Sequence, residues 1–341
     1  MKDAANTSVL VTGGSGFVGG YVVLELLRQG YCVRTTIRSL SRENQVRAML
    51  AEHVDAGDRL SFVAADLLND DGWDAAVAGC AYVHHVASPM PVGEFRGTDV
   101  ITPARAGTRR VLEASARAGV RRVVITSSTA AAMPDRPGDA VIDERTWTDR
   151  PDRPAFNYPR AKTLAEQDAW AFVRDHDQPF ELTTVLPASI QGPVLGSDYS
   201  ASVDLLRLML KGKMPAVPRM GYNIVDVRDL AALHLLAMIT PEAAGQRYIA
   251  AGDFLWFSDI ARILREGLGD SAARTPKRTI PDFIIRLGAF SNPEMRQIAP
   301  ILGQRTTYSS AKAESLLGHP LRSARDAVLD AARSLIDRGL A

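Results

Sequence analysis

Tyr158 and Lys162 are the two residues whose types and spacing most directly suggest chemistry. They stand four positions apart, and residues at this spacing lie on one face of a helix. A tyrosine phenol has an ordinary pKa of about 10, and a neighbouring ammonium group favours its ionised form. We therefore expect Lys162 to lower the pKa of Tyr158, so that this phenol can exchange a proton with a substrate near neutral pH.

Hydroxyl side chains end an apolar run, at Thr126, Ser127 and Ser128. In open α/β sheets, ligands bind beyond the carboxyl ends of the strands. We expect Ser128 to hydrogen-bond the substrate oxygen. A tyrosine and a lysine at this spacing are common on helix surfaces, so the nearby hydroxyls strengthen the prediction of a catalytic site.

A cluster of glycines lies between an apolar run at residues 9–11 and a helical pattern that starts at Phe17. Strand, glycine turn and helix in this order are typical of a dinucleotide site. Gly13 is expected to allow the tight turn, Gly16 to let backbone N–H groups approach a pyrophosphate, and Gly19 to let the helix pack closely on the strand. A purely structural loop is the alternative interpretation.

The end of the second apolar run, at Ile37 and Arg38, indicates which dinucleotide binds. An acidic residue here would hold the ribose 2′-hydroxyl of NAD, whereas an arginine suits the 2′-phosphate of NADP. The carboxylate is missing and the arginine is present, which favours NADP(H) as the cofactor. Arg38 could instead be an ordinary solvated residue, because Arg34, Arg42 and Arg47 crowd the same region.

Three further polar residues follow expected strands. The Asp66 carboxylate could accept a hydrogen bond from the adenine amino group, or could equally stabilise a turn. His84 and His85 are adjacent on a strand and so point to opposite faces, which is a poor arrangement for a metal pair. We interpret both histidines as structural and predict no metal site.

Strand-like and helix-like runs alternate along the chain, which predicts a parallel sheet with helices on its faces. Strands are expected at residues 9–11, 33–37, 60–64, 82–87, 123–126 and 182–186. Helices are expected at residues 17–29, 42–52, 71–78, 98–118 and 159–175, with a closing amphipathic helix at 323–339. The expected fold class is α/β, a doubly wound Rossmann-type sheet with a smaller C-terminal substrate-binding lobe.

Glycine and proline punctuate shorter elements beyond Gly192. We therefore divide the chain into a dinucleotide-binding domain with the catalytic residues at 1–191 and a mainly substrate-binding lobe at 192–341. Some segments of the second part could return to the first.

Composition excludes several classes of protein. The 341 residues carry a net charge of +1, and lysine and arginine are scattered, so no nucleic-acid or anionic-membrane surface is indicated. No apolar run is long enough for a signal peptide or a membrane span. Cys32 and Cys80 show neither the pattern of a disulfide framework nor the spacing of a zinc site. The reducing cytoplasm is therefore the expected compartment.

Together, the glycine turn, the Thr126-Ser127-Ser128 hydroxyls and the Tyr158/Lys162 pair resemble the extended short-chain dehydrogenase/reductase family. Residues 31–38, 86–89 and 186–193 are similar to its branch of dihydroflavonol reductases, cinnamoyl-CoA reductases and bacterial aldehyde (ketone) reductases. That branch often has lysines after the arginine of the second strand. Here Glu43-Asn44-Gln45 occupies those positions, so we expect fewer phosphate contacts and a larger share for Arg38.

The resemblance implies roles for individual residues. Tyr158 would be the proton donor, Lys162 would also bind the nicotinamide ribose, and Ser128 rather than Ser127 would orient the carbonyl. It also implies further cofactor contacts near the strand ends. They are Ser15, Phe17, Val18, Leu67, Val86, Ala87, Ser88, Thr126, Pro187, Ala188 and Ser189.

These observations predict NADPH-dependent reduction of an aldehyde or ketone. The segments expected to face the nicotinamide, at residues 88–92, 129–134 and 191–206, are mostly small or apolar, which suits a small apolar or aromatic carbonyl compound. One alternative is a nucleotide-sugar epimerase or dehydratase with bound NAD, and another is a non-catalytic NADP-sensing protein. The sequence leaves the physiological substrate open, and it allows a monomer or a homodimer.

Overall fold

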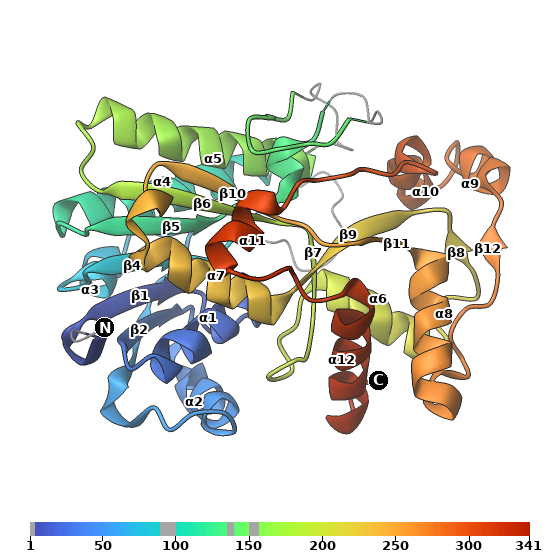
Figure 1. Cartoon of the computed structure of the whole chain (residues 1–341), viewed down its shortest axis with the longest axis horizontal. Coiled ribbons are helices and arrows are strands. Elements are labelled where there is room, and N and C mark those ends of the chain that lie inside the picture. The colour runs from blue at the N-terminus through green and yellow to red at the C-terminus, as the bar shows by residue number, and fades with distance from the viewer. Residues whose placement is uncertain (1–3, 89–99, 135–139, 150–156) are drawn as a thin grey trace.

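The computed structural model describes residues 4–88, 100–134, 140–149 and 157–341 (Figure 1). Within them, seven parallel strands form one sheet in the order β10-β6-β5-β4-β1-β2-β3. The strands are β1 (Ser8–Thr12), β2 (Cys32–Ile37), β3 (Leu60–Ala64), β4 (Tyr82–His85), β5 (Arg122–Thr126), β6 (Glu181–Pro187) and β10 (Gln246–Ala250). The strand order reverses between β1 and β4. The carboxyl ends of these two strands therefore form the switch point of a doubly wound fold.

Helices cover both faces of the large sheet (Figure 1). One face carries α1 (Phe17–Arg28), α2 (Glu43–Ala51) and α7 (Val227–Ile239), and the other carries α3 (Trp73–Val77), α4 (Ile101–Arg117) and α5 (Asn157–Asp175). Successive residues of β1 divide between the two cores: Val9 and Val11 pack with α1, whereas Leu10 packs with α4. A strand buried on both faces carries a continuous apolar run, as β1 does at Val9, Leu10 and Val11. The predicted α/β Rossmann-type fold is confirmed.

The six predicted strands are all present, with ends that differ by at most two residues. The fourth ends at His85 rather than at Ala87, because the backbone N–H groups of Val86 and Ala87 donate to the Thr12 hydroxyl at 3.0 and 2.9 Å. Helix α5 begins two residues before the predicted start, and Pro159 stands in its first turn, where a missing N–H is tolerated. Strand β10 was not predicted.

The remaining elements form a smaller group at the right of Figure 1. A three-stranded sheet contains β7 (Ser189–Gln191), β9 (Gly221–Asp226) and β11 (Phe254–Trp256), and β8 (Val217–Pro218) pairs with β12 (Thr279–Ile280). The helices here are α6 (Ala201–Leu210), α8 (Phe257–Leu268), α9 (Asp282–Gly288), α10 (Pro293–Ile298) and the closing α12 (Ala324–Asp337). The chain reaches the large sheet again through α7, β10 and α11 (Ala311–Leu317). The division at residue 191 stays a prediction.

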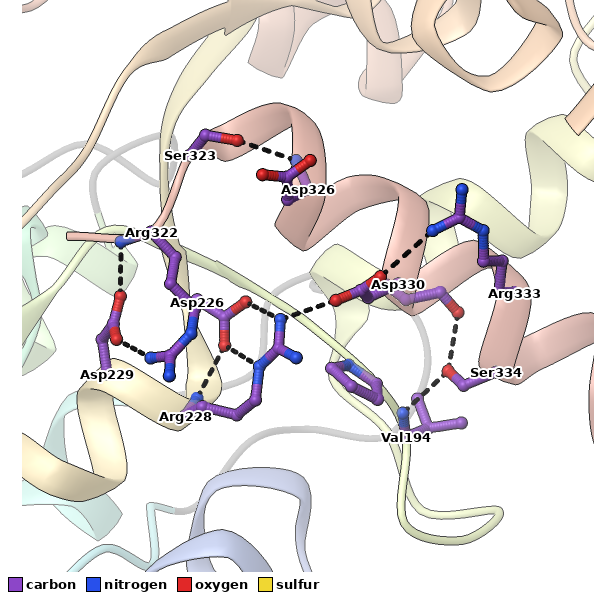
Figure 2. Close-up of polar contacts among 12 residues, drawn as sticks. Val194, Asp226, Arg228, Asp229, Arg322, Ser323, Asp326, Asp330, Arg333 and Ser334 are labelled. Atoms are coloured by element: carbon purple, nitrogen blue, oxygen red, sulfur yellow. Dashed lines mark hydrogen bonds and ion pairs between the residues drawn. The ribbon is translucent and has the colours of Figure 1, made fainter. Parts of the chain in front are cut away.

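A network of charged side chains joins α12 to the start of α7 (Figure 2). Asp226 and Asp229 are fully buried. Asp226 binds Arg228 at 2.6 Å, and the same guanidinium reaches Asp330 of α12 at 2.8 Å. Asp229 accepts the backbone N–H of Arg322 at 2.6 Å and also pairs with its guanidinium. The network therefore fixes the closing helix against α7.

Candidate active site

The carboxyl ends of the parallel strands meet at one edge of the large sheet, where α5 also begins. Ser128 lies just beyond β5, and its hydroxyl caps the short helix Thr129–Ala132 by accepting the N–H of Ala130 at 3.1 Å. Tyr158 and Lys162 stand in the first two turns of α5. The fold therefore brings the predicted serine, tyrosine and lysine to the same edge.

The Ser128 hydroxyl lies close enough to the Tyr158 phenol to stabilise its ionised form. Burial raises the pKa of the Tyr158 phenol above its ordinary value, and the neighbouring Ser128 hydroxyl opposes this. This pKa is therefore raised rather than lowered as expected, because burial is the largest influence on it and Lys162 is not among the groups that shift it. Tyr158 is consequently held in its protonated form, which is the form that donates a proton.

Lys162 extends under the end of β5, where its ammonium group lies 3.5 Å from the Thr126 carbonyl oxygen. Burial lowers the pKa of Lys162 from 10.5 to about 8, and the carboxylate of Glu166 opposes that effect. A small cavity of about 20 Å³ adjoins the ammonium and is also lined by His85 and Thr108. Lys162 is therefore a partly buried cation that loses its proton at a pH only slightly above neutral.

Ser127 points to a different partner from its neighbour Ser128. Its hydroxyl donates to the Glu166 carboxylate at 2.6 Å, and Glu166 is 2% exposed. Glu166 was not among the predicted site residues, although its position one turn after Lys162 places it on the same face of α5.

The glycine turn has the geometry that a dinucleotide site needs. Gly13 has a φ of +74°, and Gly16 begins α1 with no side chain capping the free N–H groups. A Cβ added at Gly19 would lie 2.2 Å from the Gly13 carbonyl oxygen, so only glycine allows this packing of helix on turn. Gly14, which was not predicted, is equally constrained, because its Cβ would lie 2.1 Å from the Thr35 hydroxyl oxygen. These residues fit a pyrophosphate at the start of α1.

Arg38 follows β2 and is exposed. Its guanidinium has no hydrogen-bond or ion-pair partner in the part of the chain that the structure describes. By contrast, Arg42 pairs with Asp198 and Arg47 with Glu43. The arginine that was predicted to meet a 2′-phosphate is thus available to an anion.

The other predicted cofactor residues lie in segments at the same edge of the sheet. They are Ser15, Phe17 and Val18 around the start of α1, Asp66 and Leu67 after β3, Val86, Ala87 and Ser88 after β4, Thr126 at the end of β5, and Pro187, Ala188 and Ser189 at the junction of β6 and β7. Asp66 accepts the N–H of Leu68 at 3.0 Å, so its carboxylate shapes a turn. Phe17 is buried and packs its ring edge-on against Tyr21.

The two adjacent histidines point to opposite faces of the sheet, as expected. His84 Nε2 lies 3.3 Å from the Met238 sulfur on α7, whereas His85 Nδ1 lies 3.0 Å from the Thr12 hydroxyl. Burial lowers the pKa of His85 to about 3, and the nearby Lys162 adds to this. In the described residues no three metal-binding side chains gather at one place.

The segments expected to face a substrate are largely packed. Residues 89–92 lie outside the described residues. Ala130, Ala131, Val194, Leu195 and Leu206 are all buried, so they belong to the protein core. Most of the apolar character that suggested substrate contacts in these segments therefore serves packing.

Residues 9–251 match the NAD dependent epimerase/dehydratase family. The chain belongs to this family. Among its relatives, cinnamoyl-CoA reductase 1 of Petunia hybrida is 32% identical over 336 residues, covering 96% of this chain and 98% of the relative. An anthocyanidin reductase of Vitis vinifera is 34% identical over 273 residues, covering 74% and 79%.

The chain is also similar in structure to a solved protein, with a TM-score of 0.82. That protein is yeast methylglyoxal/isovaleraldehyde reductase Gre2 complexed with NADPH. The identity is 25%, and the match covers 98% of this chain and 100% of the other. The predicted resemblance to the dihydroflavonol, cinnamoyl-CoA and aldehyde reductase branch is confirmed by these relatives. Among the described helices, none combines the length and apolar character that a membrane span requires.

Proposed function

We propose that this protein is an NADP(H)-dependent reductase that converts an aldehyde or ketone to the alcohol. The observation that carries the proposal is the neighbouring pair of Ser128 and Tyr158, which stands at the sheet edge that also holds Lys162 and the glycine turn. Relatives named as cinnamoyl-CoA and anthocyanidin reductases support it, as does the NADPH in the Gre2 structure.

Each catalytic residue has a definite task. NADPH, when bound, supplies the hydride for the carbonyl carbon. Ser128 donates a hydrogen bond to the carbonyl oxygen, and Tyr158 delivers its proton to that oxygen as negative charge develops there. The Lys162 ammonium, one turn along α5, lies on the same helix face as the phenolate that remains and contacts the nicotinamide ribose. One hydride and one proton together complete the alcohol.

The substrate we propose is a small, largely apolar or aromatic carbonyl compound. A nucleotide-sugar needs several cations or donors around its pyrophosphate. Residues 129–134 and 191–206 contain no lysine or arginine, which speaks against such a ligand. The epimerase alternative is also disfavoured by Ile37 and Arg38, which stand where an NAD site would carry an acidic residue.

The test is to follow NADPH absorbance with a panel of aryl ketones, aliphatic aldehydes, β-keto esters, dihydroflavonols, and UDP- and GDP-sugars. We expect oxidation of NADPH with members of the first four classes. Activity with the nucleotide-sugars alone would overturn the proposal. Binding of NADPH without turnover of any carbonyl compound would instead favour the NADP-sensing alternative.

Two further parts of the proposal concern the setting of the enzyme. Cys32 and Cys80 are both free thiols, which suits the cytoplasm as the place of action. A monomer or a homodimer is proposed, and sedimentation of the purified protein distinguishes the two.

A further inference from the structure

The buried carboxylate of Glu166 lies one turn after Lys162 and has no part in the chemistry proposed above. Its side chain is 1% exposed. The hydroxyls of Ser127 and Thr184 donate to it at 2.6 and 2.7 Å, and Arg247 Nε donates at 2.8 Å. Each of these neighbours is a donor, so together they match an ionised carboxylate.

Arg247, on β10, is the partner of this carboxylate and is 9% exposed. Its Nη1 donates to the carbonyls of Glu144 and Thr146 at 2.5 and 2.8 Å. Its Nη2 reaches the Ala131 carbonyl at 3.5 Å. One guanidinium therefore connects the catalytic helix, through Glu166, with the loop that follows β5.

That loop is the one that carries Ser128. Ser128 caps the helix Thr129–Ala132, and Thr148 holds the same turn by donating its hydroxyl to the Ala130 carbonyl at 2.6 Å and its N–H to the Ala131 carbonyl at 3.1 Å. Arg247 fixes the segment that leads to Thr148 through its bonds to residues 144 and 146. The position of Ser128 thus depends on the hydrogen bonds that Arg247 donates to the backbone of this loop.

The charge of Lys162 depends on the same pair. The described titratable groups around Lys162 are Tyr158 and Glu166 on α5 and His85 at the end of β4, with Arg247 of β10 behind Glu166. His85 is neutral near pH 7, because its pKa is about 3. Glu166 is therefore the group that opposes the loss of the Lys162 proton, which burial promotes.

We propose that Glu166 and Arg247 form a positioning unit for the active site: Glu166 places its carboxylate at the cavity that Lys162 also lines and holds Ser127, and Arg247 holds Glu166 and the loop of Ser128. This inference rests on the proposed roles of Lys162 and Ser128. It assigns function to two residues that touch neither the cofactor nor the carbonyl group.

The decisive variant is Glu166→Gln, which removes the charge and keeps the size of the side chain. Carbon NMR titration of the Lys162 Cε signal, assigned by its loss in Lys162→Met, should show a midpoint about one pH unit below that of the unmodified protein. The alkaline fall of kcat should move in the same direction, because Lys162 then loses its proton at lower pH. A midpoint and a pH profile equal to those of the unmodified protein would overturn the proposal.

Thr184→Val is the matched control. It removes one hydrogen bond to the Glu166 carboxylate but leaves the charge, so the Lys162 titration should stay at the unmodified midpoint. An equal shift in Thr184→Val and Glu166→Gln would assign the effect to packing and would also overturn the proposal.

Arg247→Lys covers the case in which Glu166→Gln does not fold. It keeps a cation beside Glu166 but cannot reproduce the forked bonds to residues 131, 144 and 146. We expect kcat to fall about tenfold with unchanged NADPH affinity and an unchanged Lys162 midpoint. Unaltered kcat would contradict the positioning role. Because the NMR titration needs neither cofactor nor turnover, it separates this inference from the proposed function, which fails only if the unmodified protein reduces no carbonyl compound.

Discussion

The Arg42 guanidinium lies 2.5 Å from the Asp198 carboxylate and so ties the loop after β2 to the segment after β7. Arg42 lies four positions after Arg38 in the sequence, and as a cation it is a second candidate for binding a 2′-phosphate. Because Arg42 already has a carboxylate partner, the preference for NADP(H) should depend mainly on Arg38.

Arg38→Ala should therefore erode the preference for NADPH over NADH. A hydrogen bond to a charged group contributes about 1.5–3 kcal/mol, which corresponds to a loss of roughly tenfold to a hundredfold in the ratio of kcat/KM values. The ratio is measured by steady-state kinetics with both cofactors. Arg42→Ala is the control and should change the ratio far less. Equal use of NADPH and NADH by the unmodified protein would contradict the assignment.

Tyr158→Phe should separate binding from chemistry. The variant keeps the ring but removes the proton donor, so carbonyl reduction should fall by about a hundredfold to ten-thousandfold while NADPH binding persists. Lys162→Ala should weaken both, because Lys162 is proposed to contact the ribose as well as the phenol. Turnover is measured by NADPH oxidation and binding by fluorescence. Near-normal turnover of Tyr158→Phe would show that another group donates the proton.

Local patterns were enough to predict most of the large sheet and the residues at its edge. The glycine turn, Ser128 and the Tyr158/Lys162 pair are each encoded within a few neighbouring positions. Arg247 could not be found this way, because its partner Glu166 is 81 residues away in the chain. Strand β10, which carries Arg247, was not predicted. It lies beyond Gly192, in the part of the chain where glycine and proline separate shorter elements.

Lys162 was expected to lower the pKa of Tyr158, and this prediction was wrong for a different reason. Spacing on a helix shows that two side chains share a face, but it does not show how deeply they are buried. Burial raises the pKa of Tyr158 and lowers that of Lys162, and both directions follow from the cost of a charge in a poorly solvated site.

Mild acid should destabilise the protein through its buried histidines. Burial lowers the pKa of His85 to about 3 and of His234 to about 4, whereas both return to about 6.5 in the unfolded chain. Between these values the unfolded chain binds more protons, so the free energy of unfolding falls as pH decreases. At about pH 5 the loss is on the order of 2 kcal/mol for each histidine. Urea unfolding at about pH 7 and about pH 5 measures it.

His234→Gln should reduce this dependence on pH, because one of the buried groups no longer titrates. His319→Asn is the control, since His319 is exposed, and it should leave the dependence unchanged. If His234→Gln loses stability between the two pH values as steeply as the unmodified protein, the buried histidines are not the cause.

The closing helix should depend on the buried carboxylates at the start of α7 (Figure 2). Asp229→Asn places an amide where two donors of Arg322 now meet a carboxylate, so a repulsive contact replaces a charged hydrogen bond. Because Asp229 is fully buried and Arg322 is partly solvated, we expect a loss of about 2–4 kcal/mol in the free energy of unfolding.

Arg333→Ala is the matched control for this network. Arg333 pairs with Asp330 at 3.3 Å on the surface of α12 and is 53% exposed, so its removal should cost about 1 kcal/mol or less. Both variants are compared by urea unfolding, with NADPH affinity as a measure of the intact sheet edge. Equal losses of stability in the two variants would mean that the buried Asp229 contributes no more than a surface ion pair, and that apolar packing alone holds α12 in place.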